Sequence, residues 1–103
     1  MVNKKMETIF RFALGDTPQI RVIEFLLEGR ELDYHISDIA EGAGIGRTTL
    51  FRIWNNLIKS KIVVPTRNIG NAKLFKLNQN NPLVRKLIEL FDEIILPKRK
   101  IAN

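Results

Sequence analysis

Cysteine is absent from the 103 residues of this chain, and histidine occurs once, as His35. Without thiols the protein has no disulfide framework and no thiolate metal site. A lone histidine cannot form a histidine zinc centre, so we expect His35 to be a loop or helix-capping residue. The sequence also lacks glycine-rich phosphate loops, nucleophile motifs and metal-ligand spacings. These absences predict a protein that is not an enzyme and uses no metal or cofactor.

Long apolar runs are missing as well. No segment reaches the roughly 18 consecutive apolar residues that a membrane-spanning helix requires. The basic N-terminus is followed by Glu7, Arg11 and Asp16, which interrupt any signal-peptide core. With 45% hydrophobic and 27% charged residues, the composition is ordinary for a folded globular protein. We therefore expect one domain over residues 1–103, a cytoplasmic location and no membrane partner.

Acidic side chains are missing from one long stretch, residues 42–88, although the whole chain contains 11 of them. The same stretch carries basic residues spaced among apolar ones: Arg47, Arg52, Lys59, Lys61, Arg67, Lys73, Lys76, Arg85 and Lys86. No local carboxylate cancels their field, and the net charge of the chain is +6. This pattern indicates a folded basic surface with a polyanionic partner, and it favours nucleic acid.

Hydrophobic periodicity predicts a mainly α fold with a small β-hairpin. Apolar residues spaced by three and four predict helices over residues 4–14, 18–27, 36–43, 47–60 and 82–96. Thr17 is a good N-cap for the second helix, and Pro18 is a good first helical residue. The β-branched run at 62–64 and the segment 73–77 predict two strands, joined by a basic loop over 65–71. The segment 31–34 is expected to be a short connection.

The predicted order is helix, helix, tight turn, helix, hairpin and helix, and the turn contains glycines at positions 42, 44 and 46. The segment from Ile36 to Ile53 resembles the helix-turn-helix of MarR- and ArsR-like winged-helix regulators of prokaryotic or archaeal type. The residues that carry the resemblance are Ile39-Ala40, Gly44-Ile45, Arg47-Thr48-Thr49-Leu50 and Lys61-Ile62-Val63-Val64. The resemblance covers residues 18–77, and the terminal helices are additions to this core. Gly46 departs from the pattern, because such proteins often carry a serine N-cap there. It leaves either a backbone amide for a phosphate or simply a weaker cap.

The resemblance implies sequence-specific binding of double-stranded DNA by a transcriptional regulator. A recognition helix over 47–60 would enter the major groove, and a wing over 65–73 would lie on the backbone or in the minor groove. The expected DNA-contacting residues are Gly46, Arg47, Thr48, Thr49, Phe51, Arg52, Asn55, Lys59, Arg67, Asn68, Asn71 and Lys73. Arg47 and Arg52 suit guanine or phosphate, and Asn55 suits adenine. The outward Phe51 either meets a thymine methyl group or packs against the wing.

The terminal helices carry more apolar surface than one small core requires, which predicts a homodimer. The expected interface residues are Ile9, Phe10, Leu14, Leu87, Leu90, Phe91, Ile94 and Ile95. The alternative is that these helices complete the core of the monomer. A two-fold dimer would place its recognition helices about 34–36 Å apart, one turn of DNA.

Two other functions remain open at this point. One is a non-specific architectural DNA-binding protein. Both this protein and a transcriptional regulator would be associated with the nucleoid. The other is a winged-helix protein-interaction subunit of a transcription complex, against which the acid-free stretch argues. No set of residues identifies a small-molecule effector site. The resemblance and the composition, rich in Lys, Ile and Asn, favour a prokaryotic source, archaeal or viral.

Overall fold

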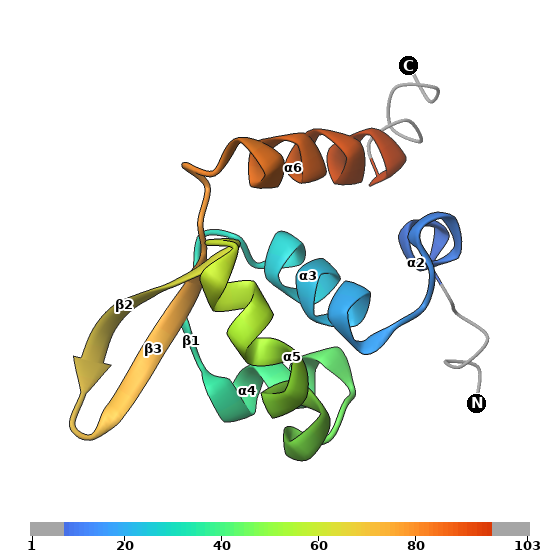
Figure 1. Cartoon of the computed structure of the whole chain (residues 1–103). Helices are drawn as coiled ribbons and strands as arrows, with labels where there is room; N and C mark the ends of the chain where they lie inside the picture. The colour runs from blue at the N-terminus through green and yellow to red at the C-terminus, as the bar shows by residue number, and fades with distance from the viewer. Residues whose placement is uncertain (1–7, 96–103) are drawn as a thin grey trace.

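The computed structural model describes residues 8–95, so residues 4–7 and 96 of the expected terminal helices lie outside the described part. Figure 1 shows the arrangement of the elements. In chain order they are α2 (Ile9–Leu14), α3 (Pro18–Glu28), β1 (Tyr34–His35), α4 (Ile36–Ala43), α5 (Arg47–Lys59), β2 (Val63–Ile69), β3 (Ala72–Leu77) and α6 (Pro82–Ile95). The chain is mainly α with a small antiparallel sheet, as the sequence predicts.

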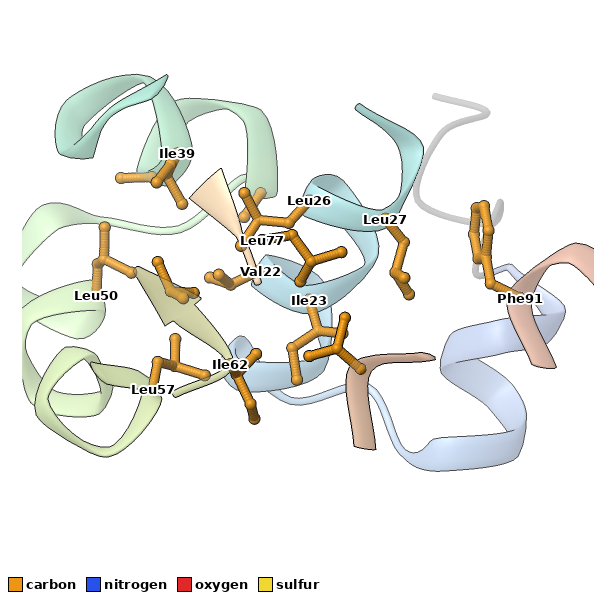
Figure 2. Close-up of a cluster of buried hydrophobic side chains, with 14 of the residues drawn as sticks. Val22, Ile23, Leu26, Leu27, Ile39, Leu50, Leu57, Ile62, Leu77 and Phe91 are labelled. Carbon is orange, nitrogen blue, oxygen red and sulfur yellow. The ribbon is translucent and has the colours of Figure 1, made fainter. Parts of the chain in front are cut away.

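Helix α3 lies at the centre of the core. It begins where the sequence predicts, because the Thr17 side chain accepts a hydrogen bond from the Ile20 amide at 3.2 Å and Pro18 occupies the first turn. Its buried apolar residues are Val22, Ile23, Leu26 and Leu27, which are at most 4% exposed. They gather with Ile39, Leu50, Leu57, Ile62 and Leu77 in Figure 2. Burial of these side chains from all parts of the chain is the main source of stability.

Two glycines shape α4 and the turn between α4 and α5. Gly44 ends α4 in the left-handed conformation, with φ of 72°, which residues with a Cβ rarely adopt. Gly42 lies against Phe25 of α3, and a Cβ at this position would overlap the aromatic ring. The glycines therefore serve both the reversal of the chain and the close packing of α4 on α3. At the other end of α4, His35 caps the helix: its Nδ1 accepts from the Ser37 amide at 3.2 Å. This confirms its expected capping role.

The sheet has three strands in the order β1-β3-β2, whereas the sequence predicted a hairpin of two. The missing strand is β1, in which Tyr34 pairs with Phe75 and His35 with Leu74. The expected loop at 65–71 is also wrong, because β2 continues to Ile69 and only a two-residue turn precedes β3. Pro65 is tolerated because β2 is an edge strand, and the pairing register shifts between Pro65 and Arg67. The wing is thus a continuous β-ribbon.

Helix α6 lies on the opposite side of α3 from α4 and α5, while the β2–β3 hairpin extends away from the helices (Figure 1). The rings of Phe10 on α2 and Phe91 on α6 meet edge to face, with centroids 5.7 Å apart. Arg30 also binds Asp92 of α6 through both terminal guanidinium nitrogens, at 2.7 and 3.3 Å. These contacts attach the last helix to the rest of the chain.

Candidate nucleic-acid interface

Helix α5 presents one apolar face to the core and one polar face to solvent. Leu50 and Leu57 are buried, and Ile53, Trp54 and Ile58 pack against the core at its edge. The apolar stripe predicted for this helix is confirmed. The opposite face is exposed and carries Arg47, Thr48, Phe51, Arg52, Asn55, Asn56 and Lys59. Thr49 is half-buried beside this face. Only Asn56 was not anticipated from the sequence as part of this set.

Phe51 is 54% exposed, which is unusual for an aromatic side chain of this size. The aromatic residue of α5 that packs against the wing is instead Trp54, whose ring meets Phe75 of β3 at 90° with centroids 5.0 Å apart. Trp54 therefore holds the wing and α5 at a defined angle, while Phe51 stays accessible on the outward face.

The base of the wing is attached to the end of α5 by amide side chains. Asn78 Nδ2 donates to the Lys61 carbonyl at 2.9 Å, and Asn81 Nδ2 donates to the carbonyls of Ser60 and Lys61 at 3.1 Å. Lys61 itself has φ of 61°, a conformation that a non-glycine residue adopts only under constraint. The asparagines satisfy the carbonyls of this strained turn and so fix where the wing begins relative to α5.

At its N-terminus α5 has Gly46 as N-cap, and no side chain caps the helix. The first-turn amides therefore lack a side-chain acceptor at the positive end of the helix dipole, where anions are favoured. A shallow hollow beside this terminus is lined by Asp16, Pro18, Arg21, Ile45, Gly46 and Thr49. Arg21 of α3 contributes a cation to this hollow. The sequence analysis did not count it, because it lies outside the acid-free stretch 42–88. Its Nε donates to Asp16 Oδ1 at 2.7 Å, which lowers the pKa of the Asp16 carboxyl.

In the wing, the exposed residues include Arg67, Asn68 and Ile69 on β2, Asn71 in the turn and Lys73 on β3. Asn68 pairs with Lys73 across the ribbon, and Ile69 pairs with Ala72 at its tip. All four polar residues were expected from the sequence. Ile69, which is 57% exposed, is an apolar side chain at the tip that the sequence analysis did not single out.

Most cations of this surface have no acidic partner. Within residues 8–95, no ion pair involves Arg47, Arg52, Lys59, Lys73 or Lys76. Arg67 differs, because it binds the carboxylate of Asp33 through Nε at 2.9 Å and Nη2 at 3.2 Å. The hydrogen bonds from Arg67 and Thr66 hold the pKa of Asp33 at about 2, and Asp33 in turn raises the pKa of Arg67. Local sequence patterns do not reveal this contact, since Asp33 lies 34 positions earlier.

The residues expected at a dimer interface divide into two groups. Phe10 and Phe91 are 1% and 6% exposed and pack inside the chain, and Leu87 and Ile94 lie partly buried against the core. For these four, the structure follows the alternative in which the terminal helices complete the monomer's core. The large apolar residues that face solvent on α2 and α6 are Ile9, Phe12, Leu14, Leu83, Leu90 and Ile95. Phe12 and Leu83 were not in the expected set.

Two other features of the described residues bear on function. No group of three or more His, Asp or Glu side chains within residues 8–95 can hold a metal ion. No helix in the same range is sufficiently long and apolar to cross a bilayer.

Together these elements define a winged helix-turn-helix protein: α4 and α5 are the helix-turn-helix, and β2 and β3 form the wing. Solved structures that share this fold include the following three. NadR in complex with 4-hydroxyphenylacetate is 25% identical, with a TM-score of 0.66 over 99% of this chain and 76% of NadR. MepR, a transcription regulator of the Staphylococcus aureus multidrug efflux pump MepA, is 18% identical, with a TM-score of 0.64 over 99% of this chain and 76% of MepR. Sso10a-2, a DNA-binding protein from Sulfolobus solfataricus, is 20% identical, with a TM-score of 0.52 over 80% of this chain and 90% of its own.

No protein-family model matches the sequence, and no curated protein sequence matches it either. The fold that these structures share with this chain is the winged helix-turn-helix that the sequence predicts.

Proposed function

We propose that this protein is a transcriptional regulator that binds double-stranded DNA as a homodimer. In this proposal α5 inserts into the major groove and the β2–β3 wing lies on the backbone or in the minor groove. The observation that carries it is the exposed face of α5, where Arg47, Arg52 and Lys59 stand without any acidic partner within residues 8–95. Winged-helix neighbours that include a transcription regulator and a DNA-binding protein support the same function.

The N-terminal half of α5 would read the bases, because a recognition helix meets base edges with its first turns. Arg47 and Arg52 can donate two parallel hydrogen bonds to guanine, and Asn55 can pair with adenine. The exposed ring of Phe51 would contact a thymine methyl group. The uncapped amides after Gly46, with Thr48 and Thr49, would bind a phosphate at the helix start. The wing residues Arg67, Asn68, Asn71 and Lys73 would add backbone contacts.

The homodimer is supported by the apolar side chains that remain exposed on α2 and α6. Ile9 and Phe12 are 61% and 77% exposed, and Leu90 and Ile95 are 39% and 44% exposed. An apolar surface of this kind on a small domain is typical of an association site. In Figure 1, α6 lies on the side of α3 away from α5, so pairing through α6 leaves α5 accessible to DNA. As a DNA-binding regulator of prokaryotic type, the protein would act on the nucleoid in the cytoplasm.

The test is selection from a random duplex library at two salt concentrations, about 50 and 200 mM, because phosphate contacts weaken steeply over that range. We expect enrichment of an inverted repeat that survives the higher salt. Retention without enrichment, lost at higher salt, would favour the non-specific architectural protein. Failure to retain any duplex at either concentration would contradict DNA binding and favour the protein-interaction module.

A further inference from the structure

One carboxylate outside the wing holds two successive residues of β2. Asp33 lies in the loop before β1, and its Oδ2 accepts from the Thr66 hydroxyl at 2.6 Å and from Arg67 Nε at 2.9 Å. Its Oδ1 accepts from Arg67 Nη2 at 3.2 Å. The contact falls at the register shift of β2, where the pairing with β3 is irregular. Three hydrogen bonds therefore converge on one acid at the least regular point of the wing.

The donors that Asp33 engages are those that a DNA phosphate would use. A guanidinium fork with a neighbouring hydroxyl binds carboxylate and phosphate oxygens in the same planar, two-pronged manner. The Arg67 side chain is 63% exposed, whereas that of Asp33 is only 17% exposed. The guanidinium therefore faces solvent, where DNA would approach, while its partner sits behind it. Asp33 occupies the Nε and Nη2 donors of Arg67, which a phosphate bound in the two-pronged manner would also use.

Among the cations of the candidate interface, the acidic partner is confined to Arg67. Of the cations expected to contact DNA, Arg47, Arg52, Lys59 and Lys73 have no acidic partner within residues 8–95, and Arg67 alone is neutralised. The neutralising acid comes from outside the acid-free stretch 42–88, brought to the wing by the fold. Because the pKa of Asp33 is about 2, the acid remains ionised at physiological pH, so the contact is not a pH switch.

We propose that Asp33 is an internal competitor of DNA that holds Thr66 and Arg67 away from backbone phosphates and thereby limits non-specific affinity. The inference rests on the proposed DNA-binding function. A duplex that meets only the wing must break the Asp33 contacts before it gains a two-pronged phosphate contact from Arg67. A duplex that also fits α5 gains base contacts that offset this loss. Asp33 thus keeps the affinity for arbitrary DNA low, because arbitrary DNA has no base contacts to offset the loss.

The experiment measures affinity for a random-sequence duplex by fluorescence anisotropy across a salt series, with Asp33→Asn and Arg67→Gln alone and combined. We expect Asp33→Asn to tighten binding by about 3–10-fold at low salt and to steepen the salt slope by about 0.9, the value for one added phosphate contact. In the Arg67→Gln background the same change should leave the slope unaltered. The matched control is Glu31→Gln, which removes an exposed charge two residues away that has no ion pair among the described residues.

Asp33→Ser provides a second variant should Asp33→Asn fail to fold, which circular dichroism will reveal. Weaker binding by both variants would overturn the proposal, because the acid would then position Arg67 for DNA instead of competing with it. An equal gain in the Arg67→Gln background, or an equal gain from Glu31→Gln, would also overturn it, since loss of any negative charge would then suffice. If neither the parent protein nor any variant binds duplex, the proposed function itself fails.

Discussion

Replacing Phe91 by alanine tests whether the last helix belongs to the core of the monomer. The side chain is 6% exposed and meets the Phe10 ring edge to face at 5.7 Å. Leu90, its neighbour on α6, is 39% exposed and serves as the matched control. The two residues are neighbours on the same helix, but Phe91 faces the core and Leu90 faces solvent.

The expected loss follows from burial. Truncating a buried phenylalanine to alanine costs about 3–5 kcal/mol, which includes the cavity that remains. Loss of the aromatic pair is part of that figure, since such pairs contribute about 0.5–1.5 kcal/mol beyond their area. For Phe91→Ala we expect about 3–4 kcal/mol, because α6 at the edge of the domain can partly relax. For Leu90→Ala we expect less than about 1 kcal/mol from the monomer, as for other surface changes.

The assay is urea denaturation followed by circular dichroism at two protein concentrations, roughly a hundredfold apart, because association stabilises by mass action. The loss from Phe91→Ala should be the same at both concentrations. The loss from Leu90→Ala should appear only at the higher one, where a dimer through α6 would form. A cost for Leu90→Ala equal to that for Phe91→Ala at the lower concentration would show that α6 does not pack through Phe91 alone. A cost for Phe91→Ala below about 1 kcal/mol would show that α6 is not part of the monomer's core.

Three further predictions concern the interface and the core. Arg52→Ala should weaken cognate binding by about 1–3 kcal/mol and relax base preference at one position; an equal loss on every duplex would make Arg52 a phosphate contact. Lys73→Ala should reduce the salt slope by about one unit, whereas Lys86→Ala on α6 should not; an unchanged slope for Lys73→Ala would remove the wing from the interface. Arg11→Met should lower the free energy of unfolding by about 2–4 kcal/mol, because it strands the carboxylate of Glu24, which is 3% exposed and 2.7 Å from Arg11 Nε. In urea denaturation, adding Glu24→Leu should recover part of that loss, and no recovery would contradict the assignment.

Local signals in the sequence predicted most helices well, although α2 begins at Ile9 after the N-cap Thr8, inside the helix expected over 4–14. The N-cap at Thr17, the proline at position 18 and the glycine at position 44 act within one turn of the chain, so their effect can be read without knowing the fold. The apolar stripe of α5 likewise requires only helical periodicity, and the structure buries Leu50 and Leu57 as that stripe predicts.

Features that depend on distant partners could not be predicted in this way. Strand β1 has only two residues, and its pairing partner Phe75 lies some 40 positions later. Pro65 indicated a loop, because whether a proline fits a strand depends on that strand lying at the sheet's edge. The same holds for the site: the exposed side chains of α5 follow from periodicity, but the contact between Asp33 and Arg67 exists only once the loop before β1 reaches the wing.

In the proposed function α5 and the wing together form the surface that binds DNA. A titration of isotope-labelled protein with duplex, followed by amide chemical shifts in nuclear magnetic resonance spectra, maps this surface residue by residue. We expect the signals of the first turns of α5 and of the β2–β3 hairpin to move, while those of the exposed residues of α2 and α6 stay in place. Shifts confined to α2 and α6, with the amides of Arg47 to Arg52 unchanged, would contradict the claim.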